Sequence, residues 1–378
     1  MKNLKTYCSM MAVMAILAFT FSSAIAVSPS SALSDVDDED AAFLGMLEPA
    51  PPGSGWLLRA GQVPLPGDAH LSAAVTPTDP WPVSPADGEI ITTSLPEFQF
   101  TAADGATKYK IEVFNLLTGV PVYTFKGIAQ CAGGLCSLKP ATALNYYTIK
   151  EKSGLYAWRV MAKVNSVWQS TYSDYARFTL LKPDGFYSTF STDDHKWFTV
   201  SGVWSLTTSG TLKTSGETGF YSSVVSKHAL QNGFVYEVKL KRKLAADAVN
   251  RIYFLGYPYD EGSLPADKQW VDGYYFEYTN ALGWAFGKTD DGASEVLASD
   301  DSSDAIVPYD WNTLTVMTQG DTVDLWINGS GVAHLTVEAP REAGFVGIAM
   351  EKTVAEKSPL SVDYAKLEYT TTAPYPIK

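Results

Sequence analysis

Two glutamates, Glu237 and Glu277, are the best-placed candidates for acid–base chemistry in this chain. Each lies in the middle of a segment in which apolar and polar residues alternate. As a strand, each segment would place its aromatic residues on one face and the glutamate on the other. Hydrolysis of a glycosidic bond needs two carboxylates about 5 to 9 Å apart across the scissile bond. Glu237 and Glu277 meet this need if their strands are neighbours. Alternatively, Glu237 forms cross-strand ion pairs beside Lys239 and Lys241 on a solvated face.

A second group of residues, in and beside the segment 256–273, has the composition of a binding site for a neutral sugar. Such a site requires flat apolar faces for stacking and a few hydrogen-bonding groups in a concavity. The alternative is that these rings pack the loop against its own sheet. The candidate ligand-binding residues are aromatic rings or carboxylates, namely Tyr257, Tyr259, Asp260, Trp270, Asp272, Tyr275 and Trp284.

Acidic clusters raise a calcium hypothesis. Asp290 and Asp291 form one cluster, and Asp300, Asp301 and Asp304 form another. Calcium takes about six to eight oxygen ligands. The spacing matches no EF-hand loop, and solvated loops are the alternative explanation.

Most other catalytic patterns are missing from the sequence. The four histidines are widely separated, and none lies in the zinc-binding pattern H-E-x-x-H. There is no G-x-S-x-G elbow and no glycine-rich phosphate or dinucleotide loop. The sequence therefore predicts neither a zinc enzyme, nor a serine hydrolase, nor a nucleotide-dependent enzyme.

The first 26 residues have the layout of a secretory signal peptide. Lys2 and Lys5 precede an apolar run at 10–21, and small residues follow, which predicts cleavage after Ala26. The run is shorter than the roughly 20 residues that span a bilayer, so we expect no membrane insertion of the mature chain. Two lysines leave with the peptide, which takes the net charge from −13 to −15. This negative charge makes nucleic acid a poor partner.

The mature chain divides into a tether, two β-rich segments and a tail. Residues 27–79 are rich in proline, serine and acidic residues and lack a periodic apolar face, so we expect a disordered tether. Period-two alternation over 80–182 and 184–370 predicts an all-β chain, with 371–378 as a C-terminal tail. The only mature cysteines, Cys131 and Cys136, predict one local disulfide in an oxidising compartment.

The first β-rich segment resembles a bacterial fibronectin type III-like module. The resemblance lies in Pro-Ala-Asp-Gly at 85–88, in the alternating residues 105–113, in Tyr-Ala-Trp-Arg-Val-Met-Ala at 156–162, and in Tyr172, Ser173 and Phe178. It implies an immunoglobulin-like sandwich. The insertion that carries the two cysteines is not part of the general pattern.

The second β-rich segment resembles the concanavalin A-like, laminin G-like superfamily. The carrying motifs are Trp-Asn-x-Leu-x-Val at 311–316, Asp-x-Val-x-Leu-Trp-Ile-Asn-Gly at 321–329, Gly-Phe-Val-Gly-Ile at 344–348 and Val-Asp-Tyr-x-x-Leu at 362–367. The pairs Gly320-Asp321 and Asn328-Gly329 also predict two tight hairpins. The resemblance implies a jelly-roll β-sandwich whose concave face holds glycans in many relatives. It also implies that Asp363, in the final strand, helps to fix a structural calcium ion.

Together these features predict a secreted, cell-surface or periplasmic binding protein whose jelly roll recognises carbohydrate or a glycosylated surface. No cofactor other than a structural calcium ion is expected. Two alternatives stay open. One is a carbohydrate-active hydrolase that uses Glu237 and Glu277, and the other is a structural or adhesive protein that binds another protein.

Overall fold

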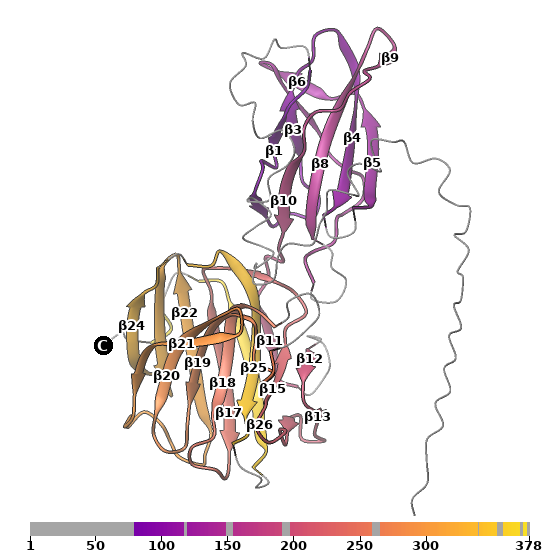
Figure 1. The fold of residues 1–378 in the computed structure, drawn as a ribbon. Helices are drawn as coiled ribbons and strands as arrows, with labels where there is room; N and C mark the ends of the chain where they lie inside the picture. The colour runs from indigo at the N-terminus through magenta and orange to yellow at the C-terminus, as the bar shows by residue number, and fades with distance from the viewer. Residues whose placement is uncertain are drawn as a thin grey trace, which may run out of the picture. The chain divides into compact units, whose positions relative to one another are not determined.

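The computed structural model describes residues 79–116, 119–148, 154–190, 197–258, 265–338, 340–353, 358–370 and 373–375. All of its regular elements are strands, which confirms the predicted all-β class (Figure 1). No helix in this described part of the chain is long and apolar enough to cross a bilayer. The predicted signal peptide, nearly all of the predicted tether, and Tyr259 and Asp260 lie outside the described residues.

The first β-rich segment folds into two sheets that enclose a core. One sheet has the order β1 (Pro82–Ser84), β3 (Phe98–Thr101), β7 (Leu135–Leu138) and β6 (Gln130–Ala132). The other has the order β2 (Glu89–Ile91), β10 (Ala176–Leu180), β8 (Leu155–Val164), β4 (Ala106–Asn115) and β5 (Pro121–Gly127), with β9 (Val167–Trp168) paired to β8.

The core of this first sandwich is aromatic. The ring of Phe98 lies 4.9 Å from that of Trp158, in an edge-on arrangement that suits the ring quadrupoles. Trp158 is fully buried, and its indole N–H donates to the carbonyl of Pro85 at 2.8 Å. The predicted disulfide is present and joins Cys131 of β6 to its register partner Cys136 of β7. The bridge therefore closes one hairpin, as the short separation of the cysteines suggests.

An ion pair between Asp87 and Arg177 gives the first sandwich an acid-sensitive element. The Arg177 side chain donates to both carboxylate oxygens of Asp87, at 2.8 and 2.7 Å. Burial raises the pKa of the Asp87 carboxyl, but the hydrogen bonds and charge of Arg177 outweigh it and hold the pKa below its usual value.

We expect this pair to add stability above the unfolded-state pKa of about 3.9 and to lose it as the pH falls through the lower folded-state pKa. Asp87→Asn should therefore lower the melting temperature at pH 7 and have little effect at pH 2. Thermal unfolding followed across this pH range tests the prediction. An equal loss of stability at both pH values would contradict it.

The second β-rich segment folds into two larger sheets. The β17 sheet has the order β13 (Trp204–Leu206), β14 (Leu212–Thr214), β26 (Leu360–Glu368), β17 (Val235–Arg242), β22 (Asn312–Gln319), β23 (Thr322–Ile327) and β24 (Ser330–Thr336), with β11 (Phe186–Ser188) on β26. The β18 sheet has the order β12 (Phe198–Ser201), β15 (Tyr221–Val225), β25 (Ala343–Glu351), β18 (Asn250–Tyr257), β19 (Asp272–Tyr278), β20 (Trp284–Asp290) and β21 (Ala293–Asp300), with β16 (Leu230–Gln231) on β25.

Alternation along the strands separates the core of this second sandwich from its outer faces. Tyr236, Val238 and Leu240 of β17 point inward and belong to the same buried cluster as Phe276 and Tyr278 of β19. The residues between them therefore point outward on each sheet. The strand order also brings early strands beside late ones, since β14 pairs with β26 and β15 pairs with β25.

The two predicted hairpins are confirmed. β22 pairs antiparallel with β23 across the Gly320 turn, and β23 pairs with β24 across Asn328-Gly329. Asn328 and Gly329 have φ of 52° and 76°, and a type I′ hairpin turn needs positive φ at both central residues. Turn chemistry thus fixes the register of the strands at this edge of the β17 sheet.

Candidate functional site

Glu237 and Glu277 do not form a catalytic pair. Glu237 lies on β17, whose neighbours are β22 and β26, whereas Glu277 lies on β19, between β18 and β20 in the other sheet. Each carboxyl is opposite the inward-facing core residues of its own strand, so the two point away from each other on opposite sides of the sandwich. The condition set by the sequence, that these strands are neighbours, is not met.

Glu277 is instead the charge partner of a buried arginine. Arg251 Nε lies 2.6 Å from Glu277 Oε2, and only 4% of the arginine side chain is exposed. The guanidinium carbon lies 3.9 Å from the ring centre of Tyr275 and 4.5 Å from that of Tyr221. Burial lowers the pKa of Arg251, but surrounding negative and aromatic groups outweigh it and raise the pKa. This arrangement is an interior ion pair enclosed by rings.

The loop aromatics predicted to bind sugar are buried in the structure. Trp270 is fully buried, and its ring is parallel to that of Tyr253 with centroids 4.5 Å apart. Its indole N–H donates to Ser223 Oγ at 3.2 Å. Glycine at 347 makes room for this ring, because a Cβ there would lie 2.2 Å from Trp270. Trp270 is thus a packing residue that holds its loop on the β18 sheet.

The other described members of the predicted set are also inaccessible. Tyr257 packs edge-on against Phe345, and Tyr275 covers Arg251. Trp284 belongs to the core between the two sheets. The described rings are therefore buried and do not form exposed stacking platforms, and Trp270 packs its segment against the β18 sheet, as the alternative interpretation expects.

Asp272 is held by an ion pair as well. It is buried and pairs with Arg341. Burial raises the pKa of the Asp272 carboxyl even though Arg341 opposes this shift. Its oxygens are therefore engaged inside the protein and do not line an open loop.

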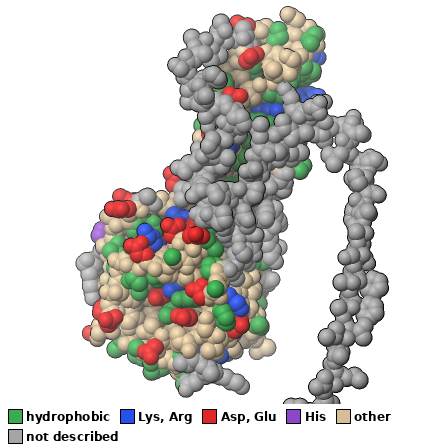
Figure 2. Space-filling model, in the orientation of Figure 1, with side chains coloured by type: hydrophobic (Ala, Val, Ile, Leu, Met, Phe, Trp, Pro, Cys, Tyr) green, Lys and Arg blue, Asp and Glu red, His purple; other side chains and the backbone are tan. Residues whose placement is uncertain are grey.

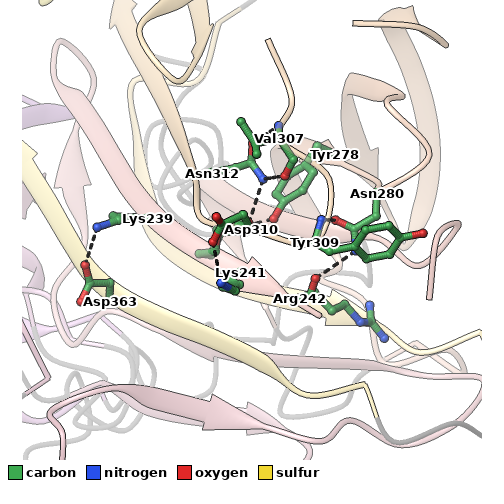
Figure 3. A network of polar contacts seen from close by, with 11 residues as sticks. Lys239, Lys241, Arg242, Tyr278, Asn280, Val307, Tyr309, Asp310, Asn312 and Asp363 are labelled. Carbon is green, nitrogen blue, oxygen red and sulfur yellow. Dashed lines mark hydrogen bonds and ion pairs between the residues drawn. The ribbon is translucent and has the colours of Figure 1, made fainter. Parts of the chain in front are cut away.

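Asp363, the residue predicted to bind calcium, pairs with a lysine. Figure 3 shows the ion pair of Lys239 with Asp363, and Lys239 Nζ lies 2.9 Å from Asp363 Oδ2. Across the described ranges, no group of three or more histidine, cysteine, aspartate or glutamate residues is arranged to hold a metal ion. A calcium-binding role for Asp363 stays a prediction, and its ammonium neighbour competes with a cation for the carboxylate.

The outer face of the β17 sheet carries partly exposed rings and polar groups beside an area on which Tyr375 of the C-terminal segment packs. Tyr187 is 56% exposed, and its ring lies 5.8 Å from that of the half-buried Tyr364. Farther along the face, the ring centre of Trp311 lies 5.4 Å from Lys239 Nζ and 5.8 Å from Lys241 Nζ. We call this surface, with Tyr187, Glu237, Lys239, Lys241, Trp311, Asp363, Tyr364 and Lys366, the β17 face.

Polar groups on the β17 face are mostly engaged with one another. Lys241 bonds Asp310 at 2.5 Å beside the Lys239 pair (Figure 3). Glu237 accepts hydrogen bonds from the hydroxyls of Tyr364 at 2.7 Å and Thr315 at 3.2 Å. These contacts leave the β17 face with alternating donors and acceptors. On the side of the second sandwich that Figure 2 shows, acidic and basic side chains are likewise intermingled.

The sequence contained a usable signal for the β17 face. Lys239 and Lys241 occupy the outward positions of β17, as the alternation predicted, and Trp311 precedes the β22 motif. What the sequence did not indicate is that Tyr187 joins this face, because its strand β11 reaches it by pairing with β26, far away in the chain.

No family model and no curated protein matches this sequence. Solved structures resemble about half of the chain. They include the carbohydrate-binding module CBM66 from Bacillus subtilis, at 18% identity and a TM-score of 0.35, covering 45% of this chain and 94% of that one. A β-glucanase of Bacillus licheniformis matches at 14% identity and a TM-score of 0.39, covering 50% and 99%. No residue role follows from similarities at this level.

Proposed function

We propose that this chain is a secreted, non-catalytic binding protein whose second sandwich recognises carbohydrate through the β17 face. The observation that carries the proposal is the set of rings Tyr187, Tyr364 and Trp311, partly or well exposed on one regular sheet surface among hydrogen-bonding side chains. Sugar C–H groups stack on such rings, and neutral hydroxyls exchange hydrogen bonds with paired lysines and carboxylates.

The strand order supports a concanavalin A-like, laminin G-like jelly roll for this sandwich. Its early strands pair with its late ones in both sheets, and consecutive strands repeatedly pass from one sheet to the other. We further propose that the first sandwich is a fibronectin type III-like spacer, supported by its motifs and by its two small sheets around an aromatic core.

The separation of Glu237 from Glu277 favours binding over hydrolysis. The only carboxylate pair for which the sequence supplied a catalytic argument lies on opposite sides of the sandwich. Glu237 has Tyr364 and Thr315 hydroxyls as donors, and Glu277 neutralises Arg251. Both acids therefore have roles that do not require a reaction.

A glycan array, followed by titration of the best neutral ligand, tests the proposed function. We expect Tyr187→Ala and Trp311→Ala each to weaken binding about tenfold, or about 1.4 kcal/mol, since a lost aromatic anchor commonly costs this much. The matched control is Trp81→Ala in the first sandwich, where the ring is 47% exposed and lies off the β17 face. Repeating the titration with a calcium chelator tests whether Asp363 depends on a cation.

Two results would count against this proposal. One is an array on which the parent protein binds no glycan. The other is unchanged affinity in both ring variants, which would move the binding surface away from the β17 face.

A further inference from the structure

The outer face of the first sandwich places lysines directly opposite lysines on neighbouring strands. In the register of β4 with β5, Lys110 lies directly opposite Lys126. In the register of β4 with β8, Lys108 lies directly opposite Lys163. Like charges directly opposite each other in an antiparallel pair are destabilising. Two such pairs, next to each other on three adjacent strands, are a local conflict of the kind that proteins accept at functional sites.

All four lysines point to the same side of their sheet. Lys108 and Lys110 alternate with the buried Tyr109 and Ile111, so they face away from the core. Lys163 is the cross-strand partner of Trp168 in β9, which adds an aromatic ring to this surface. We call Lys108, Lys110, Lys126, Lys163 and Trp168 the lysine patch.

Two of the ammonium groups lie close to the Trp168 ring. Lys126 Nζ and Lys163 Nζ each lie 5.7 Å from its ring centre. A cation over an aromatic face gains electrostatic attraction from the ring quadrupole. That gain is shared by two groups that repel each other, so the arrangement concentrates positive charge around one partly exposed ring.

Acidic residues neutralise only part of the patch. Lys110 is paired with Glu112, whose carboxylate is also bonded by Arg159 at 2.9 Å and by the Tyr172 hydroxyl at 2.5 Å. Within the described residues, Lys108, Lys126 and Lys163 form no ion pair. The chain as a whole carries a net charge of −13, so this accumulation of lysines does not reflect its average composition.

We propose that the lysine patch binds an acidic polysaccharide, one whose sugar units carry carboxylates. Neighbouring strands are about 4.8 Å apart, so the ammonium groups on β5, β4 and β8 span roughly 10 Å across the sheet. An extended polyanion lying across the strands meets several lysines in turn, and Trp168 offers a flat face to a sugar ring. Bound carboxylates would relieve the repulsion within both lysine pairs.

The chemistry favours a carboxylated glycan over a nucleic acid. Single-stranded nucleic acids are generally held by several successive aromatic platforms, whereas the patch has one ring beside its lysines. This inference is independent of the neutral-sugar site on the β17 face, because the two surfaces belong to different sandwiches.

Affinity electrophoresis of the full chain in gels containing polygalacturonate tests the proposal. We expect retardation that disappears in 0.5 M NaCl and is absent in gels containing a neutral galactan, since the contacts are ionic. The double variant Lys126→Gln/Lys163→Gln should weaken retardation at least tenfold, and Trp168→Ala should weaken it several-fold. The matched control is Lys139→Gln, which removes an exposed lysine paired with Glu97 at 3.7 Å on the opposite sheet.

Stability provides a second readout. If the lysines serve a ligand, removing their repulsion should leave the melting temperature of Lys126→Gln/Lys163→Gln equal to or above that of the parent. Three results would overturn the proposal: no retardation of the parent, equal retardation of the double variant, or equally strong binding of single-stranded DNA, which would make the patch a general polyanion surface. Binding to neutral glycans, measured on the same proteins, reports separately on the β17 face.

Discussion

Replacing Trp270 by alanine is expected to lower the free energy of unfolding by about 3–5 kcal/mol, the usual cost of removing a large buried ring. The ring is fully buried and stacks on Tyr253. Its removal leaves a cavity lined by that ring and by the backbone at Gly347, and it leaves Ser223 without its indole donor. The loop that Trp270 holds on the β18 sheet should then become more accessible to proteases.

Calorimetry and limited proteolysis measure this effect. Trp81→Ala is the control, since Trp81 is 47% exposed and its loss should change the melting temperature little. We expect glycan binding by Trp270→Ala to persist at temperatures where the variant is folded. A variant with parental stability and no glycan binding would show that the ring contacts ligand, against the packing described above.

The second large effect is expected at Arg251. Arg251→Met should destabilise the protein by about 3–5 kcal/mol, because it leaves the Glu277 carboxylate buried without its partner. Only 14% of the Glu277 side chain is exposed, so water can compensate little of this loss. The double variant Arg251→Met/Glu277→Leu removes both charges and should recover part of the stability, as replacement of a whole buried pair by apolar groups is often tolerated.

An exposed ion pair in the same sheet provides the comparison. Lys288 Nζ lies 3.0 Å from Glu295 Oε2, with side chains 44% and 61% exposed. Lys288→Met should cost no more than about 1 kcal/mol, the usual range for a surface pair. Chemical denaturation of the three variants and the parent measures all of these differences. Similar costs for Arg251→Met and Lys288→Met would mean that burial does not amplify the Arg251 pair.

Local patterns in the sequence predicted the strands well. The alternation around Tyr236 and Phe276 placed the apolar residues inward, and the Asn328-Gly329 turn marked a tight hairpin. The Cys131–Cys136 bridge followed from there being two mature cysteines close together in the chain. These features depend on residues near one another in sequence, so composition and spacing are sufficient to find them.

Site assignments failed where they depended on partners distant in the chain. Alternation indicated that Glu237 and Glu277 face away from their own aromatic rows, and both do. It could not indicate that β17 and β19 belong to different sheets, because strand order depends on long-range pairing. The same limit applies to Trp270, whose burial requires the glycine at 347 in a strand far along the chain.

The sequence by itself determined the all-β class, the turns and the side of each strand on which a residue lies, since backbone pleating and turn geometry are local properties. Only the tertiary structure decided which outward faces are shared, which rings are covered, and which charges are paired. Those outcomes depend on how strands pair across long stretches of chain. For this reason the candidate sites proposed from the structure are the β17 face and the lysine patch, whereas the sequence had indicated the segment 256–273.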